Sequence, residues 1–204
     1  MLFRKSFRLT LVLCFVLTGT LLPAKAHAKT AKAGRVAPAR QIVTGTVVGI
    51  SGRLAGRTLP FRLIVNNYTS ANDADRLNAA LRSGQDELLS ALSKLDAGRI
   101  SVGNNVGVTA NAVFETPTVE GGMKLIVLFQ RNVNFFELRA GTRSSDYRFG
   151  YAEIYLDRRG RGEGTFIPAA KVKLEGNSWV VEDFGEFPAR LIGMRSSGTV
   201  SNAR

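Results

Sequence analysis

Residues 70–95 read SANDADRLNAALRSGQDELLSALSKL, and this stretch carries a helical period between two regions that are rich in β-forming residues. Apolar residues recur three or four positions apart in two stripes: Ala74, Leu77 and Leu81, then Leu88, Ala91, Leu92 and Leu95. A hydroxyl followed three residues later by an acid, the pattern of a capping box, occurs at Ser70-x-x-Asp73 and again at Ser83-x-x-Asp86. We predict two short helices, broken near Ser83-Gly84, that lie with their apolar stripes against a sheet.

The sequence on both sides of the helices predicts β-strands. Residues 41–51 and 58–67 are rich in Val, Ile, Thr and Leu, and the glycine-containing segment between them predicts an antiparallel hairpin. Six further strands are predicted at 106–115, 123–130, 133–139, 148–156, 165–174 and 179–187. The run from Met123 to Phe129 is nearly continuous in apolar residues, which favours a central strand covered on both faces.

These elements define an α+β fold class. We expect an antiparallel sheet or partly closed β-barrel of about eight strands, with a two-helix hairpin inserted after the first β-hairpin.

The first 28 residues have the features of a secretory signal peptide. Three basic residues within the first eight precede an apolar run from Leu9 to Leu22, and Ala26-His27-Ala28 suits cleavage after Ala28. The run of about 14 residues is shorter than the ~20 that a membrane-spanning helix needs. We therefore expect a secreted or periplasmic protein that has no transmembrane segment after cleavage.

Cleavage after Ala28 would remove the single cysteine, Cys14, and the single histidine, His27. Thiol nucleophiles, disulfides, imidazole bases and nearly all zinc, copper and haem sites are then excluded from the mature chain. We expect no cofactor, no metal site and no redox chemistry.

Composition divides the chain into four regions: a signal peptide at 1–28, a disordered basic linker at 29–40, a single α+β domain at 41–195 and a flexible tail at 196–204. Loss of the signal peptide removes four basic residues and lowers the formal charge from +12 to +8, whereas Arg53 to Glu186 hold 17 basic and 16 acidic residues. The basicity therefore belongs to the ends of the chain.

The linker carries four basic residues: Lys29, Lys32, Arg35 and Arg40. They predict weak attraction to anionic envelope surfaces, and a solvated spacer is the alternative interpretation. No nucleic-acid partner is expected, because basic residues interleaved with stacking aromatics are not found on one element.

Strand register points to a candidate ligand-binding face. Gly176-Asn177 is a favoured two-residue turn, and pairing of Glu175 with Ser178 sets Lys171 opposite Glu182. Extending this alternation into 148–156 predicts one mixed aromatic and charged face with six candidate residues: Tyr147, Tyr151, Glu153, Tyr155, Lys171 and Glu182. Tyrosines beside charged groups suit a glycan or another flat polar ligand. The alternative is that the leucine stripes of the helices cover this face.

Two other functions remain open from the sequence. A carboxylate-dependent envelope glycan hydrolase would need an acid pair, for which Glu153 with Glu182 or Asp183 are the candidates. A structural protein–protein interaction module would need an exposed apolar patch, for which Met123–Phe129 is the candidate if that strand lies at an edge.

At the level of whole runs, FRLIVNNYT (61–69), DYRFGYAE (146–153) and EDFGEFPARL (182–191), the chain resembles a group of exported bacterial proteins with no assigned activity. The resemblance implies export and carries no catalytic residues over to this chain. Our expectation is an exported, non-redox, non-metal binding or scaffold domain, with an unknown ligand that belongs to the envelope or is a glycan.

Overall fold

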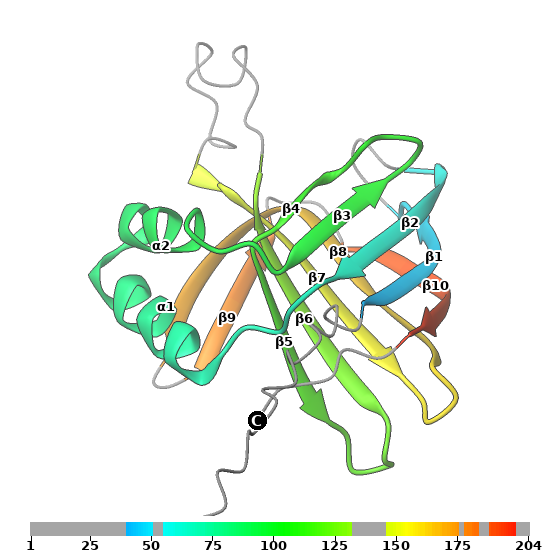
Figure 1. The fold of residues 1–204 in the computed structure, drawn as a ribbon. Helices are drawn as coiled ribbons and strands as arrows, with labels where there is room; N and C mark the ends of the chain where they lie inside the picture. Colours follow the sequence, from blue (N-terminus) through cyan, green and yellow to red (C-terminus); the bar gives the residue numbers. More distant parts are fainter. Residues whose placement is uncertain (1–39, 51–54, 132–145, 176–177, 184–187, 199–204) are drawn as a thin grey trace, which may run out of the picture. The chain divides into compact units, whose positions relative to one another are not determined.

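The computed structural model describes residues 40–50, 55–131, 146–175, 178–183 and 188–198, all within the compact unit Val36–Arg204 (Figure 1). The elements are β1 (Gln41–Val48), β2 (Thr58–Val65), α1 (Ala71–Ser83), α2 (Gln85–Leu92), β3 (Gly98–Val102), β4 (Val108–Ala110), β5 (Ala112–Pro117), β6 (Met123–Gln130), β7 (Phe149–Leu156), β8 (Arg161–Glu175), β9 (Ser178–Asp183) and β10 (Ala189–Ser197). The predicted signal peptide, the linker up to residue 39, the strand at 133–139, the Gly176-Asn177 turn and the tail from 199 lie outside the described residues.

The predicted α+β fold class is confirmed. The described strands form one antiparallel sheet in the order β4-β3-β2-β1-β10-β8-β7-β6-β5, and β9 pairs with β8 outside this path. The hairpin β1–β2 precedes the two helices, as predicted. β6 pairs with both β5 and β7 and is therefore a central strand that offers no open edge. Neither helix has the length and apolarity needed to cross a membrane, and no other described residues form such a helix.

The sheet curls into a nearly closed barrel because one run of chain joins its two ends. β4 pairs with β3 and β5 pairs with β6, while Asn111 alone separates β4 from β5. The Asn111 side chain is buried; its Nδ2 donates to the carbonyl of Leu95 at 3.1 Å, and its Oδ1 accepts from the amide of Gln130 at 2.9 Å. Asn111 thus fixes the point at which the strand changes its partner.

Apolar side chains from alternate positions fill the barrel. Within this core Phe129 stacks on Phe166 at 6.3 Å, and Phe61 meets Phe166 edge-on at 6.4 Å, both between ring centroids. Leu63, Leu125 and Leu191 are among the core side chains with no exposed surface. These buried side chains pack together and form the core inside the barrel.

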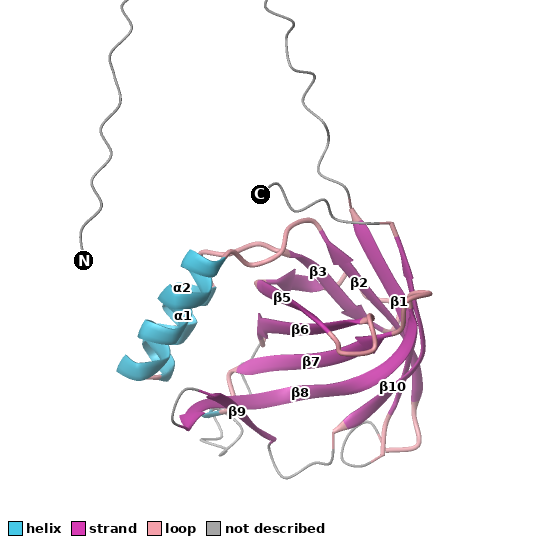
Figure 2. Cartoon of the chain, turned by 90° about the horizontal axis from the view of Figure 1, so that it is seen from below, coloured by secondary structure: helices cyan, strands magenta, loops and turns pink. Residues whose placement is uncertain are grey.

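Helices α1 and α2 cover one flank of the barrel from outside (Figure 2). Their buried leucines contact outward-facing residues of the sheet, in a second cluster that includes Leu77, Leu81, Leu88, Leu92, Leu128, Phe149, Tyr151 and Val172. The indole Nε1 of Trp179 on β9 donates to Oδ1 of Asn78 on α1 at 2.5 Å. The helical pair is therefore an integral layer of the domain.

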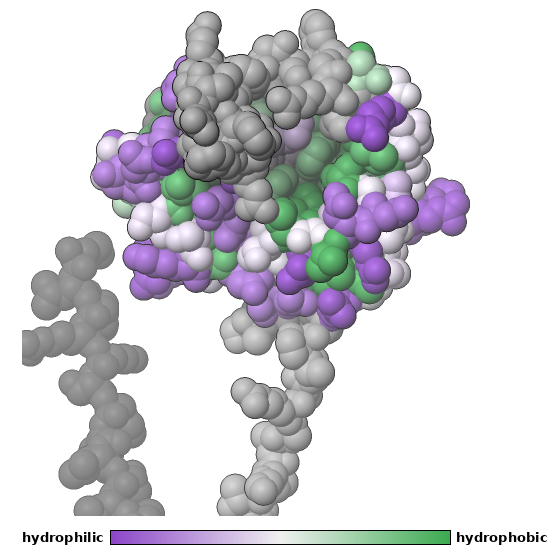
Figure 3. Space-filling model, turned by 90° about the horizontal axis from the view of Figure 1, so that it is seen from above, coloured by the Kyte–Doolittle hydropathy of each residue, from purple (hydrophilic) through white to green (hydrophobic). Residues whose placement is uncertain are grey.

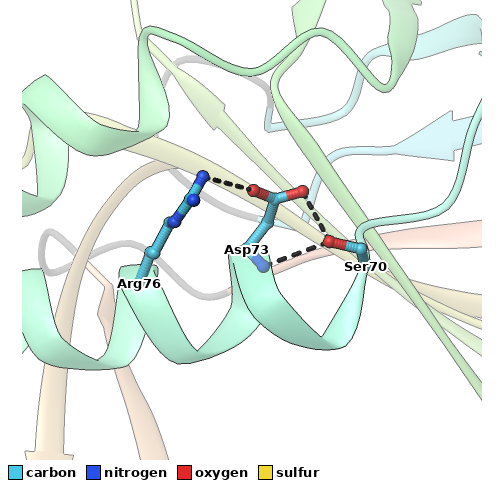
Figure 4. A network of polar contacts seen from close by, with 3 residues as sticks. All are labelled: Ser70, Asp73 and Arg76. Atoms are coloured by element: carbon cyan, nitrogen blue, oxygen red, sulfur yellow. Dashed lines mark hydrogen bonds and ion pairs between the residues drawn. The ribbon is translucent and has the colours of Figure 1, made fainter.

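One of the two predicted capping boxes is confirmed. Ser70 Oγ accepts from the amide of Asp73 at 3.1 Å, and the Asp73 carboxylate in turn contacts Arg76 at 3.5 Å (Figure 4). The second prediction is wrong: Ser83 belongs to the last turn of α1, where its hydroxyl donates to the carbonyl of Ala79 at 3.4 Å. A hydroxyl at a helix end can satisfy either terminus, and here it serves the preceding helix.

Candidate functional site

A β-bulge in β8 divides the six predicted site residues between two faces. Tyr151 pairs with Ile167 and Phe149 with Ala170, so two steps on β7 match three on β8. Pro168 lies in this interval, and since proline has no N–H it cannot continue the ladder. Before the bulge even-numbered Phe166 faces the barrel core, whereas after it even-numbered Val172 faces the helices.

The prediction of one shared face is therefore wrong. Tyr151, Glu153 and Tyr155 lie on the outer, helix-bearing face of β7, because their neighbours Ala152 and Ile154 point into the barrel. Lys171 and Glu182 lie on the opposite face of the sheet, away from the helices. The local register itself is confirmed: Lys171 pairs with Glu182 and Val172 with Val181.

Glu153 is the centre of the first group of predicted residues. Its carboxylate accepts from the hydroxyl of Tyr151 at 2.5 Å and from the hydroxyl of Tyr155, and Lys124 Nζ lies 3.0 Å away. The Tyr151 ring is only 8% exposed beneath the helices, whereas Tyr155 is 45% exposed with Lys124 Nζ 5.2 Å from its ring centroid. A ligand can stack on Tyr155 but not on Tyr151.

The titration of this group follows from its contacts. Burial opposes ionisation of Glu153, but hydrogen bonds from Tyr151, Tyr155 and Lys124 together outweigh it and lower the pKa of Glu153. Burial, followed by the bond to Glu153, raises the pKa of Tyr151 far above its usual range. Glu153 is therefore an ionised acceptor at neutral pH and is a poor proton donor.

Glu182 is the centre of a second group on the other face. It forms an ion pair with Lys173 and accepts from the hydroxyl of Tyr147 at 3.0 Å. The hydrogen bond from Lys173, followed by that from Tyr147, lowers the pKa of Glu182. Because Glu153 and Glu182 lie on opposite faces, these two carboxylates do not flank a common site, and the side chain of Asp183 lies outside the described part.

A charged cleft lies between the turn that precedes β6 and the turn that precedes β8. It has a volume of about 840 Å³, and its lining includes Tyr155, Glu120 and three arginines at 158, 159 and 161. Arg158 Nε donates to the carbonyl of Glu120 at 2.8 Å, which joins the two turns. Of the six predicted residues, Tyr155 lines this cleft.

An apolar hollow lies at the other end of β6. It has a volume of about 400 Å³ and is lined by Ile100, Ser101, Val102, Asn105, Val106, Gly107, Val108, Phe129 and Phe166. Val106 is 85% exposed at its rim, and hydrophobic side chains gather in a hollow of the face shown in Figure 3. The sequence did not predict this site, because its walls come from β3, β4, β6 and β8, and β3 itself was not predicted.

The described residues thus define an α+β protein in which two helices flank a barrel-like antiparallel sheet with a hollow at one end. Comparison of the chain with models of known protein families, with curated proteins and with solved structures found no match. In the part of the chain that the structure describes, no three His, Cys, Asp or Glu side chains gather in a way that could hold a metal ion.

Proposed function

We propose that this chain is an exported, non-catalytic binding domain and that the apolar hollow at the end of the barrel holds its ligand. The ligand would be a small apolar molecule or the apolar part of a larger envelope component. Export rests on the amino-terminal sequence pattern, and the binding role rests on the hollow.

The composition of the hollow supports this proposal. Its volume of about 400 Å³ falls in the range of small-molecule sites, and its lining combines aliphatic and aromatic residues with two polar residues, Ser101 and Asn105. Phe129 and Phe166 connect it with the packed core, so its floor is held by the barrel. A rigid apolar surface loses little entropy when a ligand binds.

The carboxylates favour binding over hydrolysis. Hydrolysis of a glycoside requires an acid whose pKa is raised beside a second carboxylate that stays ionised. The contacts of Glu153 and Glu182 lower both pKa values, and the two residues lie on opposite faces. The cleft beside Tyr155 contains both signs of charge, because Asp157 and Glu163 lie among its arginines. It is therefore less selective for one kind of ligand than the apolar hollow is.

A fluorescence titration with N-phenyl-1-naphthylamine tests the proposal. We expect saturable binding that Val108→Thr weakens, because the substitution places a hydroxyl in the hollow on a side chain of nearly the same volume, at a desolvation cost of about 1–3 kcal/mol or roughly 5- to 160-fold in Kd. Val119→Thr is the matched control, since Val119 is fully exposed beside the charged cleft. Absence of saturable binding, or equal affinity in both variants, would refute the proposal.

A further inference from the structure

The acidic residues of this chain are confined to its middle. The first is Asp73 and the last is Glu186, so neither the sequence up to residue 72 nor that from residue 187 contains an acid. β1 and β2 come from the first of these segments, β10 comes from the second, and β1 pairs with both (Figure 1). The fold therefore joins the two acid-free ends of the sequence into one surface.

Two neighbouring strands extend this surface. β3 and β4, which continue the sheet beyond β2, also contain no acidic residue. The five consecutive strands from β4 to β10 thus contain no acidic residue, and their only charged residues are arginines on β2, β3 and β10. Their outward side chains include Arg62, Arg99, Arg190 and Arg195, all exposed, and Arg161 adjoins them on β8.

Strand register places three of these arginines in one row. Arg62 on β2 pairs with Thr44 on β1, Thr44 pairs with Arg195 on β10, and Arg195 pairs with Arg161 on β8. These four residues form one row across the four strands. At about 4.8 Å between strands the row spans roughly 14 Å. On β3 the row continues at Ser101, which pairs with Arg62, and Arg99 lies two residues before Ser101, where it pairs with Ile64. We name the surface formed by Arg62, Arg99, Arg161, Arg190 and Arg195 the arginine face.

Ion pairs neutralise only one side of the arginine face. Arg161 lies 3.7 Å from Asp157 and Arg190 lies 3.6 Å from Glu163, both at the β8 side. Arg62 and Arg195 form no ion pair with a described residue. Like charges on adjacent strands repel, so Arg195 and Arg161 gain from an external anion.

Apolar side chains alternate with the arginines. Ile192 is 39% exposed, and Ile42 and Ile64 are partly exposed on the same side of the sheet. Guanidinium groups bind phosphate through two parallel hydrogen bonds, while isoleucines between them suit the boundary of headgroups and acyl chains. A small anion would contact one or two of these groups, whereas the row as a whole matches an extended array of phosphates.

We propose that the arginine face docks on an anionic lipid bilayer surface. Arg40 directly precedes β1 and is exposed. It is also the last basic residue of segment 29–40, for which the sequence predicts attraction to the same kind of surface. Each arginine near an anionic bilayer strengthens binding about fivefold. The proposal is independent of the apolar hollow, because none of the five arginines lines that site.

Co-sedimentation of the full chain with large vesicles tests this docking. The vesicles contain phosphatidylcholine alone or with about 30% phosphatidylglycerol, at about 0.1 M salt, where exposed charges interact over ~10 Å. For the pair Arg62→Gln and Arg195→Gln we expect the partition ratio between the two compositions to fall about 30-fold. The apolar run at 9–22 is present in every variant and does not alter this comparison.

The matched control is the pair Arg76→Gln and Arg82→Gln on α1, which removes the same net charge from the helical flank. We expect the control ratio to change by no more than about twofold, and circular dichroism should show that both double variants fold. Equal losses in the two pairs would mean that net charge alone acts and would overturn the proposal. Binding to dextran sulfate through Arg62 and Arg195 without binding to anionic vesicles would assign the face to a polysaccharide and would also overturn it.

Discussion

Replacement of Asn111 by alanine tests how the two ends of the sheet are joined. The substitution removes one hydrogen bond to the carbonyl of Leu95 and one from the amide of Gln130. A buried polar group left without its partner costs about 1–3 kcal/mol, so the two together set a range of roughly 2–6 kcal/mol. Leu95 is half-buried and Gln130 is exposed, so water can form hydrogen bonds with the freed backbone groups and reduce the cost. We expect the free energy of unfolding to fall by about 2–3 kcal/mol.

Urea unfolding followed by circular dichroism measures this loss, with Asn105→Ala as the control. Asn105 is exposed in the β3–β4 loop and donates one hydrogen bond of 3.2 Å to the carbonyl of Val102, so its loss should cost less than about 1 kcal/mol. The amide of Gln130 should also exchange faster with solvent in Asn111→Ala. If the two variants are equally stable and the exchange of Gln130 is unchanged, the Asn111 side chain does not hold the barrel closed.

Three further substitutions test other contacts by urea unfolding. Glu153→Gln should lower the free energy of unfolding by about 1–2 kcal/mol at pH 7. Because the folded pKa of Glu153 is lowered, the stabilisation from its ionised form is present above the unfolded pKa of about 4.3 and is lost as pH falls through the folded pKa. The variant should therefore lose less stability than the wild type between about pH 5 and 3, and equal losses in the two proteins would contradict this. Ser70→Ala removes the cap of α1 and should cost about 1 kcal/mol, against no measurable change for Ser90→Ala. Trp179→Phe should lower the free energy of unfolding by at least about 0.5–1.5 kcal/mol, because it removes the hydrogen bond to Asn78. In the double variant, Asn78→Ala should lower it little further, because that hydrogen bond is already lost.

Local patterns in the sequence predicted much of this fold. The helix pair, the first hairpin, the central strand β6 and the β8–β9 register are each determined within a short stretch, by periodicity or by a turn. The sequence did not predict β3 or β10. β3 has five residues and begins at Gly98, a residue type typical of a helix stop, and β10 contains Gly193 and a register shift between Leu191 and Met194. Both strands owe their stability to partners far away in the sequence.

The candidate site was harder to predict than the fold. The six residues at 147–182 were placed on one face by counting alternate positions through β8, and the bulge at Pro168 reverses that count. A proline within a strand is the signal that could have warned of the reversal. The walls of the apolar hollow come from four strands, so their proximity follows from tertiary pairing and cannot be read from any single segment.

The pairing of β1 with β10 joins the first and the last of the described strands, so the sheet cannot be completed before β10 is available. Gln41 Nε2 donates to Ser196 Oγ at 2.8 Å across 155 positions of sequence, and β10 also pairs with β8. During synthesis β1 therefore has no partner on this side until β10 has been made, and such long-range pairing slows folding. A chain cut before Ala189 would keep two unpaired strand edges, at β1 and at β8. Unprotected edges of this kind pair with other copies, so loss of β10 should make the truncated chain prone to aggregation.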